Sequence, residues 1–395
     1  MTTQNPVVSQ PQKEGSFHGE QVLTISVGHF VHDIYSAFLA PLLPLIIKKM
    51  SLTLTMAGSL TAFMQISAVL NPFIGHLADK FSLRYLVILA PAVTATLMSA
   101  MGLTSNYYTL ALILFVAGVS VAVFHSPAPA MVRRVSGKQI GKGMGWFMAG
   151  GEMGRTIGPL FAVWAVSIWT LDGIYRVAVL GWVTSLILFW RLKDIPGRRP
   201  KLGSLQSILP KLRTLFLPLA IIIFFRMFMI VSITTYLPLF MNMNGASLFL
   251  AGASLSILEF AGVGGALLSG TISDRVGRRS VLLFISIIAP LLMLAFLNTT
   301  GWLLVPILLA LGFTSLSTGP VVLALVQDHF PDNGAVGNGI YMTMSSLLRS
   351  LGMLLIGIFG DAVGLQSAFF WGAIISLLAI PGILMLPMDG EMQNR

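Results

Sequence analysis

The stretch Gly75-His76-Leu77-Ala78-Asp79-Lys80-Phe81-Ser82-Leu83-Arg84 decides the fold of this chain, because a near copy of it follows 195 residues later. The copy reads Gly270-Thr271-Ile272-Ser273-Asp274-Arg275-Val276-Gly277-Arg278-Arg279, and the offset (270 minus 75) is the same for the glycine, the aspartate, the base after it and the final arginine. Both stretches lie between two long apolar runs. The repeat predicts two homologous halves of nearly equal length, with the functional site between them.

The composition is that of a membrane protein. Of the 395 residues, 55% are hydrophobic and only 10% are charged, whereas soluble domains carry about 25% charged residues. Several apolar runs reach the roughly 20 residues that cross a bilayer as a helix, and their length argues against a β-barrel, whose strands are short and alternating. The net charge of +10 does not indicate a nucleic-acid partner, because the positive charges lie in loops between apolar runs. The absence of cysteine excludes disulfides and thiolate metal sites.

We expect an all-α membrane protein with twelve transmembrane helices in two pseudo-symmetric six-helix bundles. Run lengths and breaks place the spans at 22–47, 56–78, 83–103, 107–132, 140–166, 172–192, 214–241, 248–273, 280–299, 302–327, 334–360 and 366–387. The domains that follow are a disordered cytoplasmic tail (1–20), an N-terminal bundle (21–192), a cytoplasmic linker (193–213), a C-terminal bundle (214–388) and a cytoplasmic tail (389–395).

The distribution of lysine and arginine predicts the orientation, because cytoplasmic loops carry an excess of these residues. If both termini are cytoplasmic, most of the 24 basic residues fall on the inner side, and only Lys48, Lys49 and Arg176 fall on the outer side. We therefore expect a multi-pass protein of the inner (plasma) membrane with both termini in the cytoplasm.

The repeated loops have a physical role that follows from their residues. Asp79 and Asp274 each end a span, where a carboxylate faces the negative end of its own helix dipole and needs a basic partner. We expect a charge clasp between the halves that is closed in one conformation and open in another. Its residues are Gly75, Asp79, Lys80, Arg84, Gly270, Asp274, Arg275 and Arg279.

Six ionisable side chains fall near the middle of the expected spans, where a charge is costly unless it faces a cavity or a partner. They are Asp33, Glu152, Arg155, Arg226, Glu259 and Arg349. Transporter sites are expected at this depth. Glu152 and Arg155 are three residues apart on one helix face, so they either neutralise each other or serve the site.

Asp33 has no basic residue three or four positions away, but His29 precedes it by one turn. A carboxylate beside an imidazole can carry a proton in a site that is alternately wet and dry. We assign proton coupling to Asp33, His29, Glu152 and Glu259. The alternatives are a buried hydrogen-bonding role for Asp33 and simple pairing with an arginine for Glu259; His32 and His125 are either packing residues or part of the site.

The pattern Gly-x-x-x-Asp-basic-x-(Gly/Ser)-x-Arg between the second and third spans resembles the signature loop of the major facilitator superfamily of transporters. The piece from Gly154 to Gly158-Pro159 resembles the sequence that marks antiporters in that superfamily. Three stretches further resemble the fosmidomycin-resistance group of efflux proteins. They are Gly28-His29-Phe30-Val31-His32-Asp33 running on to Pro41-Leu42-Leu43-Pro44, then Val123-Phe124-His125-Ser126-Pro127, and the run from Gly150-Gly151 to Gly158-Pro159.

This resemblance implies proton-driven export of small amphipathic or anionic compounds, with the first, fourth, seventh and tenth spans lining a central cavity. On that basis substrate binding is assigned to Arg226, His125, Gln65, Tyr35, Arg349 and Arg155. Arg226 favours an anionic or phosphonate-like group, because a guanidinium binds such groups bidentately. The antiporter-type helix is assigned to Gly150, Gly154, Gly158 and Pro159.

Two other transport modes fit the same residues. A proton symporter that imports an anionic metabolite is the alternative, and a passive channel is a third reading that the two-fold repetition disfavours. An enzyme is not expected, because the sequence has no phosphate-binding loop, metal-ligand cluster or nucleophile triad. We expect a monomer in the lipid bilayer with no cofactor, no bound metal and no nucleic-acid partner, whose partners are protons and a small-molecule substrate.

Overall fold

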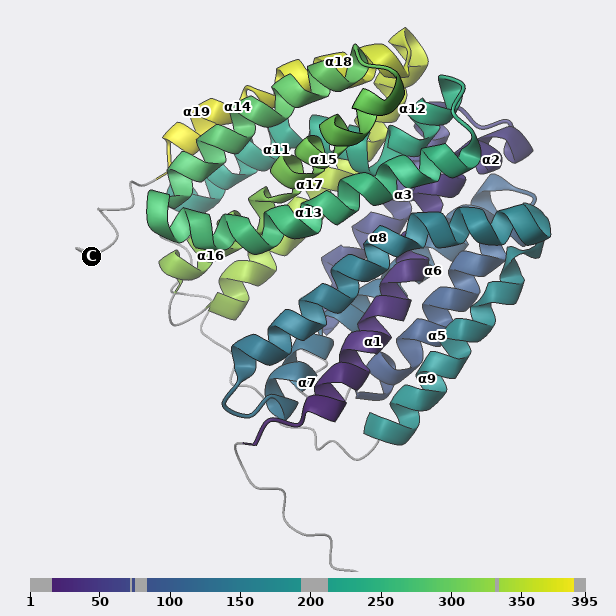
Figure 1. The fold of residues 1–395 in the computed structure, drawn as a ribbon, viewed down its shortest axis with the longest axis vertical. Helices are drawn as coiled ribbons and strands as arrows, with labels where there is room; N and C mark the ends of the chain where they lie inside the picture. The colour runs from purple at the N-terminus through teal and green to yellow at the C-terminus, as the bar shows by residue number, and fades with distance from the viewer. Residues whose placement is uncertain (1–15, 72, 75–83, 193–211, 331–333, 387–395) are drawn as a thin grey trace, which may run out of the picture.

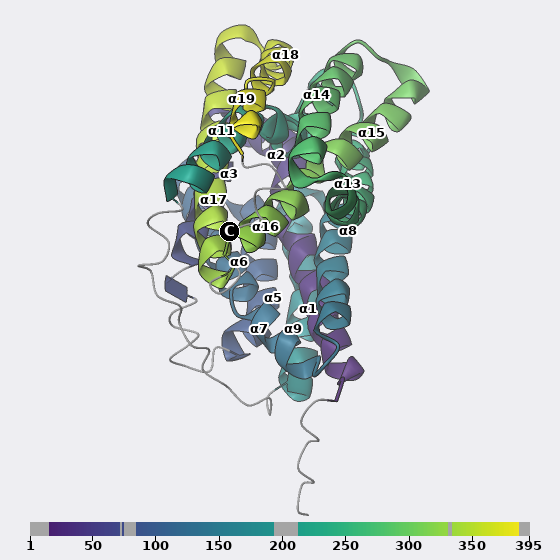
Figure 2. The same cartoon turned by 90° about the vertical axis from the view of Figure 1, so that its left-hand side faces the viewer.

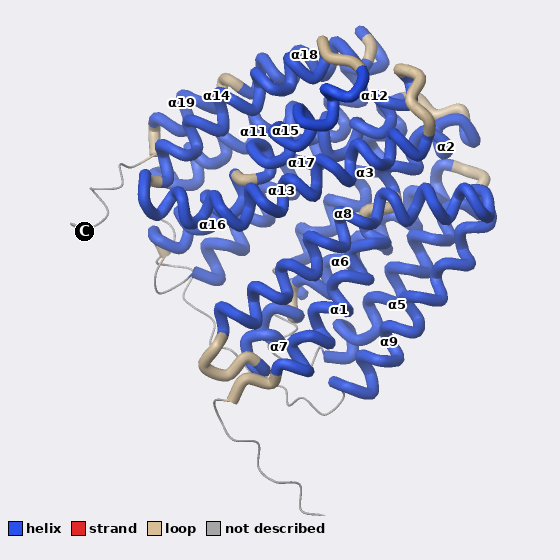
Figure 3. Tube along the Cα trace, viewed as in Figure 1, coloured by secondary structure: helices blue, strands red, loops and turns tan. Residues whose placement is uncertain are grey.

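The computed structural model describes residues 16–71, 73–74, 84–192, 212–330 and 334–386. Within these ranges every regular element is a helix, as the uniform blue of Figure 3 shows. Large apolar side chains, among them Trp182, Trp190 and Phe284, are more than half exposed on the outside of the bundle. Water would not tolerate such a surface, whereas lipid does, so the expected all-α membrane fold is confirmed.

The first half of the chain, which we call the N lobe, comprises described residues 16–192. Its elements are α1 (Gly19–Ser36), α2 (Leu39–Met50), α3 (Leu54–Ile66), η1 (Ser67–Leu70), α5 (Arg84–Ala100), η2 (Met101–Leu103), α6 (Tyr107–His125), α7 (Ala128–Val135), α8 (Ile140–Gly173), η3 (Ile174–Val177) and α9 (Ala178–Leu192).

The second half, the C lobe, comprises described residues 212–386. Its elements are η5 (Leu212–Phe216), α11 (Leu217–Val231), η6 (Ser232–Tyr236), α12 (Leu237–Met243), α13 (Leu248–Val276), α14 (Arg278–Leu297), η7 (Gly301–Leu303), α15 (Leu304–Leu316), α16 (Thr318–His329), α17 (Gly334–Val363), α18 (Leu365–Ser376) and α19 (Ala379–Leu384).

Ten helical stretches of the described chain are long and apolar enough to cross a membrane, and Leu54–Leu70 is a shorter apolar helix. One of the ten, Lys142–Leu192, has 51 residues, about 76 Å at 1.5 Å per residue, which is too long for a single crossing. Its backbone leaves the helical region at Thr170, where φ is 60°. The expected number of twelve spans and the domain boundaries stay predictions; the tail 389–395 and most of 1–20 and 193–213 lie outside the described residues.

Each lobe has its own apolar core. The two lobes lie one above the other in both views (Figures 1 and 2). They meet mainly where α3 packs on α17 and α8 packs on α13, with α2 against α12. We call the end where α1 begins and α19 ends the terminal end, and the opposite end, with loops 51–53 and 244–247, the distal end. Close approaches between the lobes, such as Gly58 to the carbonyl of Met353, lie in the distal half.

Candidate functional site

The site is built where α1 packs on α8. Small residues allow helices to approach closely in a membrane, and α8 presents a stripe of glycines to α1. A Cβ atom on any of these glycines would collide with the α1 backbone or with the His29 ring; they are Gly150, Gly151, Gly154 and Gly158. The predicted antiporter-type helix therefore lies directly against the helix that carries Asp33.

His29 occupies the space that the missing side chain of Gly151 leaves. Its ring stacks on Phe147 of α8 with the ring centroids 4.1 Å apart, and its Nδ1 lies 2.8 Å from the Phe147 carbonyl oxygen. A carbonyl oxygen can only accept, so Nδ1 of His29 carries a hydrogen and donates it.

His125 meets the same pair from α6, which ends at His125 shortly before the helix-breaking Pro127. Its Nε2 lies 3.3 Å from Asp33 Oδ1 and 3.1 Å from Nε2 of His29. Nε2 of His29 in turn lies 3.4 Å from Asp33 Oδ2. We call His29, Asp33 and His125 the triad.

The backbone hydrogen bonds of the two imidazole rings determine which ring nitrogens face the centre of the triad. Nδ1 of His125 lies 2.9 Å from the carbonyl of Val121 and therefore also donates. If both rings were neutral, their Nε2 lone pairs would face each other and the carboxylate, so three acceptors would meet without a donor. One proton on either Nε2 supplies that donor. A single bound proton would therefore supply the hydrogen bond that this geometry lacks.

Only one of the three triad side chains has substantial exposed surface. The side chains of Asp33 and His29 are 3% and 5% exposed, whereas that of His125 is 31% exposed. The neighbouring His32 is fully buried beside Phe124, and neither of its ring nitrogens has a hydrogen-bond partner. A buried imidazole without hydrogen-bond partners costs folding free energy. Nothing in the sequence indicated that His32 would lack such partners.

The triad also has the donor types of a transition-metal site. One ligating atom from each side chain can be chosen so that all lie within 4.8 Å of one another. A divalent cation could stand here in place of the proton, so metal ions belong among the controls of any transport assay.

A second charged group joins the two lobes. Arg155 of α8 forms an ion pair with Glu152 on its own helix, and its Nε lies 3.7 Å from Glu259 of α13 in the C lobe. The Arg155 side chain is 43% exposed. Arg349 of α17, one turn from Ser346, has a buried Nε without a hydrogen-bond partner.

Gln65 adds a polar contact between the lobes, because its amide nitrogen lies 3.3 Å from Ser346 Oγ of α17. Two contacts between the lobes thus involve predicted site residues, that of Gln65 between α3 and α17 and that of Arg155 with Glu259 between α8 and α13. We call these contacts, with the neighbouring Glu152 and Arg349, the lobe boundary; the assignment of its residues to proton coupling and substrate binding stays a prediction. Ser346 was not anticipated, since a serine in an apolar span carries no distinctive signal.

Tyr35 and Arg226 point into their own lobes in this conformation. The Tyr35 hydroxyl donates to the carbonyl of Val177 at 2.5 Å. Arg226 is 4% exposed and donates to neutral oxygens of α14, α15 and α16; these are Ser286 Oγ at 3.1 Å, the Ser315 carbonyl at 3.3 Å and Thr318 Oγ1 at 2.7 Å. Their assignment to substrate binding stays a prediction.

Of the two repeated loops, only the second is described in full. Gly75, Asp79 and Lys80 lie outside the described residues, and Arg84 begins α5 with its guanidinium 4.8 Å from the centre of the Tyr85 ring. In the second loop Asp274 lies 2.6 Å from Arg278, which also lies 3.2 Å from Asp328 of α16.

These contacts of the second loop stay within the C lobe, between α13, α14 and α16. Gly270 is open on its Cβ side, and Arg275 is exposed. Arg278 makes the contacts with Asp274 that were expected of Arg275 and Arg279. The repeat had singled out the other two arginines because they match Lys80 and Arg84 in the first loop. A clasp between the lobes stays a prediction.

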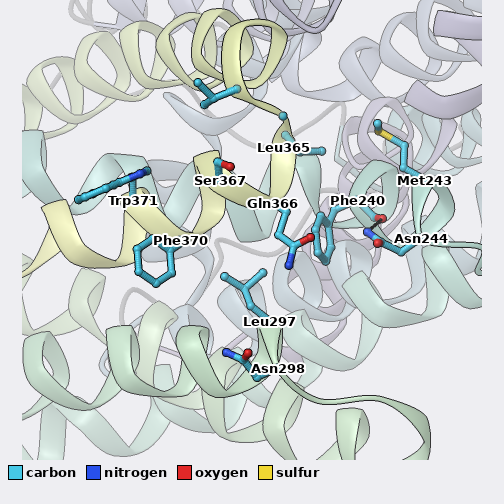
Figure 4. A pocket seen from close by; sticks show the side chains of 12 residues that line it. Phe240, Met243, Asn244, Leu297, Asn298, Leu365, Gln366, Ser367, Phe370 and Trp371 are labelled. Carbon is cyan, nitrogen blue, oxygen red and sulfur yellow. Dashed lines mark hydrogen bonds between the residues drawn. The ribbon is translucent and has the colours of Figure 1, made fainter.

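A separate cavity of about 620 Å³ opens at the distal end of the C lobe (Figure 4). It is lined by residues of α12, α14 and α18 and by residues just beyond the ends of α12 and α14; among them are Phe240, Asn244, Asn298, Gln366 and Trp371. None of the triad or lobe-boundary residues lines it, so it does not belong to the candidate site.

Comparison with known proteins gives a family and a fold. The model of the Major Facilitator Superfamily matches residues 25–353. The fosmidomycin resistance protein of Escherichia coli (strain K12) is 24% identical over 370 residues, covering 90% of each chain. The multidrug resistance protein MdtG of Klebsiella pneumoniae (strain 342) is 21% identical over 292 residues, covering 70% of this chain and 71% of its own.

Solved structures share the fold at lower identity. The nucleoside transporter NupG superposes with a TM-score of 0.75 at 16% identity, covering 93% of this chain and all of its own. A D-xylose-proton symporter superposes with a TM-score of 0.72 at 15% identity, covering 96% of this chain and all of its own. Likeness at this level concerns the arrangement of helices and not the substrate.

Proposed function

Since this chain belongs to the major facilitator superfamily, we propose that it is a proton-coupled antiporter of the inner membrane, which exports small amphipathic or anionic compounds by alternating access. Members of the family are transporters and not enzymes. Proton coupling, antiport and the class of substrate are the finer elements of the proposal, and they are argued from the triad and the lobe boundary.

The observation that carries the proposal is the triad. Its three acceptors need one proton to stay together, and His125 alone connects them with the surroundings. A group that holds a proton in one state and loses it in another must change its exposure or its neighbours between states. Rocking of the lobes would change the surroundings of His125 and Arg155, because Arg155 already contacts Glu259 of the other lobe.

The lobe boundary is the proposed substrate site. Arg155 is the more exposed cation there, and Arg349 has an unpartnered donor, so an anionic group on the substrate finds charge-assisted partners. Gln65 and Ser346 add neutral hydrogen-bonding groups from both lobes. Arg226 lies deeper, bonded to its own lobe, and would need a change of conformation to reach a substrate.

Export is favoured over import by two observations. The glycine stripe of α8 has the form of the antiporter-type helix, and it packs on the triad. The likeness to a fosmidomycin resistance protein extends over 90% of the chain. The alternative is a proton symporter for an anionic metabolite, and the fold is compatible with it because a D-xylose-proton symporter has the same arrangement.

The experiment that tests the proposal uses purified protein in liposomes of known orientation with a pH-sensitive dye inside. A susceptibility screen of cells that lack or overproduce the protein first supplies a substrate. An antiporter moves protons opposite to the substrate, and a symporter moves them together, so the sign of the dye signal separates the two. Substrate movement without any dye response, at several substrate gradients and with metal ions chelated, would refute proton coupling.

A further inference from the structure

The carboxylate of Asp361, near the end of α17 in the C lobe, caps the first turn of α3 in the N lobe. It accepts hydrogen bonds from the backbone N–H groups of Leu54 and Thr55, both at 2.8 Å, and from the Thr55 hydroxyl at 2.6 Å. Thr53 caps the same turn from within the N lobe, with its side chain 3.1 Å from the Met56 nitrogen. The start of α3 is therefore held by two caps, one from each lobe.

A carboxylate in this place is strongly favoured. The first N–H groups of a helix have no partner within the helix, and the positive end of the helix dipole attracts an anion. Asp361 is exposed to the surroundings, so burial does not force it into this position. Its three hydrogen bonds to α3 hold it there.

The helices on either side of this cap are in backbone contact. A Cβ atom at Gly58 of α3 would collide with the Met353 carbonyl, and one at Gly357 of α17 would reach the Leu54 carbonyl. The fully buried Tyr236 joins the same two helices, because its hydroxyl donates to the Met353 carbonyl of α17 at 2.7 Å and lies 3.3 Å from the Leu54 carbonyl of α3. At the distal end α3 and α17 thus meet through their backbones and the Tyr236 hydroxyl, and Asp361 lies at the edge of this contact.

We propose that Asp361 is a latch for the distal end: it stabilises the conformation in which α3 and α17 touch, and its three hydrogen bonds break when the lobes separate there. The latch lowers the population of the conformation that is open at the distal end. This inference uses only the alternating motion of the two lobes. It does not depend on protons, on antiport or on the identity of the substrate.

The test exploits the absence of cysteine from the chain. Ala40 of α2 is partly buried against the apolar cluster of the C lobe, so a cysteine in Ala40→Cys becomes more accessible when the distal end opens. Its rate of labelling by a membrane-impermeant maleimide, applied from the distal side, measures that opening without any transport. In this background Asp361→Ala is expected to raise the labelling rate about fivefold, the effect of removing a helix cap, and Asp361→Asn less.

The matched control is Asp172→Asn. Asp172 is also a carboxylate of the distal end, but it pairs with Lys49 inside the N lobe, so its loss should leave the labelling rate unchanged. An equal rise in this control would mean that any lost charge loosens the end, and the latch would be refuted. Labelling of folded Asp361→Ala at the parent rate would refute it as well.

Should Asp361→Ala not fold, Thr55→Val decides, because it removes only the hydroxyl donor of the cap. We expect about a threefold rise in labelling, the low end for one hydrogen bond, because Asp361 is exposed and its charge is screened. No rise would refute the latch. A failure here leaves the proton proposal untouched, since that proposal is read from the dye signal of the unmodified chain.

Discussion

Nε2 of His29 and Nε2 of His125 lie 3.1 Å apart, although both rings already donate through Nδ1 to backbone carbonyls. With both rings neutral, two lone pairs would face each other at this distance, and a proton on either Nε2 would turn the contact into a hydrogen bond. This relationship joins residues 96 positions apart in the sequence, and the first two predictions test it.

Asp33→Asn removes the charge that holds the proton in the triad but preserves the shape of the side chain. We expect gradient-driven export to fall by about 10-fold to 100-fold, the value of one or two hydrogen bonds to a charged group, while folding and the yield of monodisperse protein stay normal. Export is measured as uptake into inverted vesicles under an imposed pH gradient. Full export by this variant would remove Asp33 from the proton role.

Gly151→Ala places a methyl group in the space of the His29 ring. The His29 ring must then move away from the Phe147 carbonyl. Nδ1 of His29 loses its hydrogen-bond acceptor, and the distances within the triad change. We expect a loss of proton coupling with the protein still folded. Gly145→Ala on the same helix is the control, because a Cβ there meets nothing within 4 Å; similar losses in both variants would point to helix flexibility instead.

Arg155→Gln should distinguish substrates by their charge. The loss of an exposed guanidinium at the lobe boundary is expected to weaken the apparent affinity for anionic substrates about tenfold, and for neutral ones less than about threefold. Arg226→Gln serves as the comparison, because Arg226 is 4% exposed and bonded within the C lobe. If Arg226→Gln were the selective variant, the substrate would reach deeper into the C lobe than proposed.

His32→Phe tests why a buried imidazole without partners is retained. Phenylalanine keeps an aromatic ring beside Phe124 and removes two unsatisfied nitrogens, so the melting temperature should stay equal or rise by a few degrees. We expect transport to slow nevertheless, because nitrogens without partners in this conformation serve another one. Normal transport combined with higher stability would make His32 a packing residue.

The positions of the helices were largely predictable from the sequence. The span expected at 248–273 is α13, Leu248–Val276, and the one expected at 107–132 comprises α6 and α7, ending at Val135. The length of an apolar run and the glycines, prolines and charges at its ends decide these limits.

The direction of individual side chains was less predictable. Tyr35 and Arg226 were expected to face the substrate, yet they bond within their own lobes. A helix that is apolar on all sides has no hydrophobic face from which its rotation could be inferred. The contact between His29 and His125 depends on that rotation and on the close approach of α1 to α8. The contact of Asp361 with the start of α3 depends on how the two lobes pack. None of these leaves a local mark in the sequence.

The unequal exposure of the triad has a consequence for stoichiometry. Of its three members only His125 has appreciable free surface. If the triad carries the proton as proposed, a solute that covers this ring would block the path of the proton, and a proton on the ring would alter the charge that the solute meets. One-for-one exchange can then arise from direct competition at a single imidazole, with no signal passing between distant parts of the molecule.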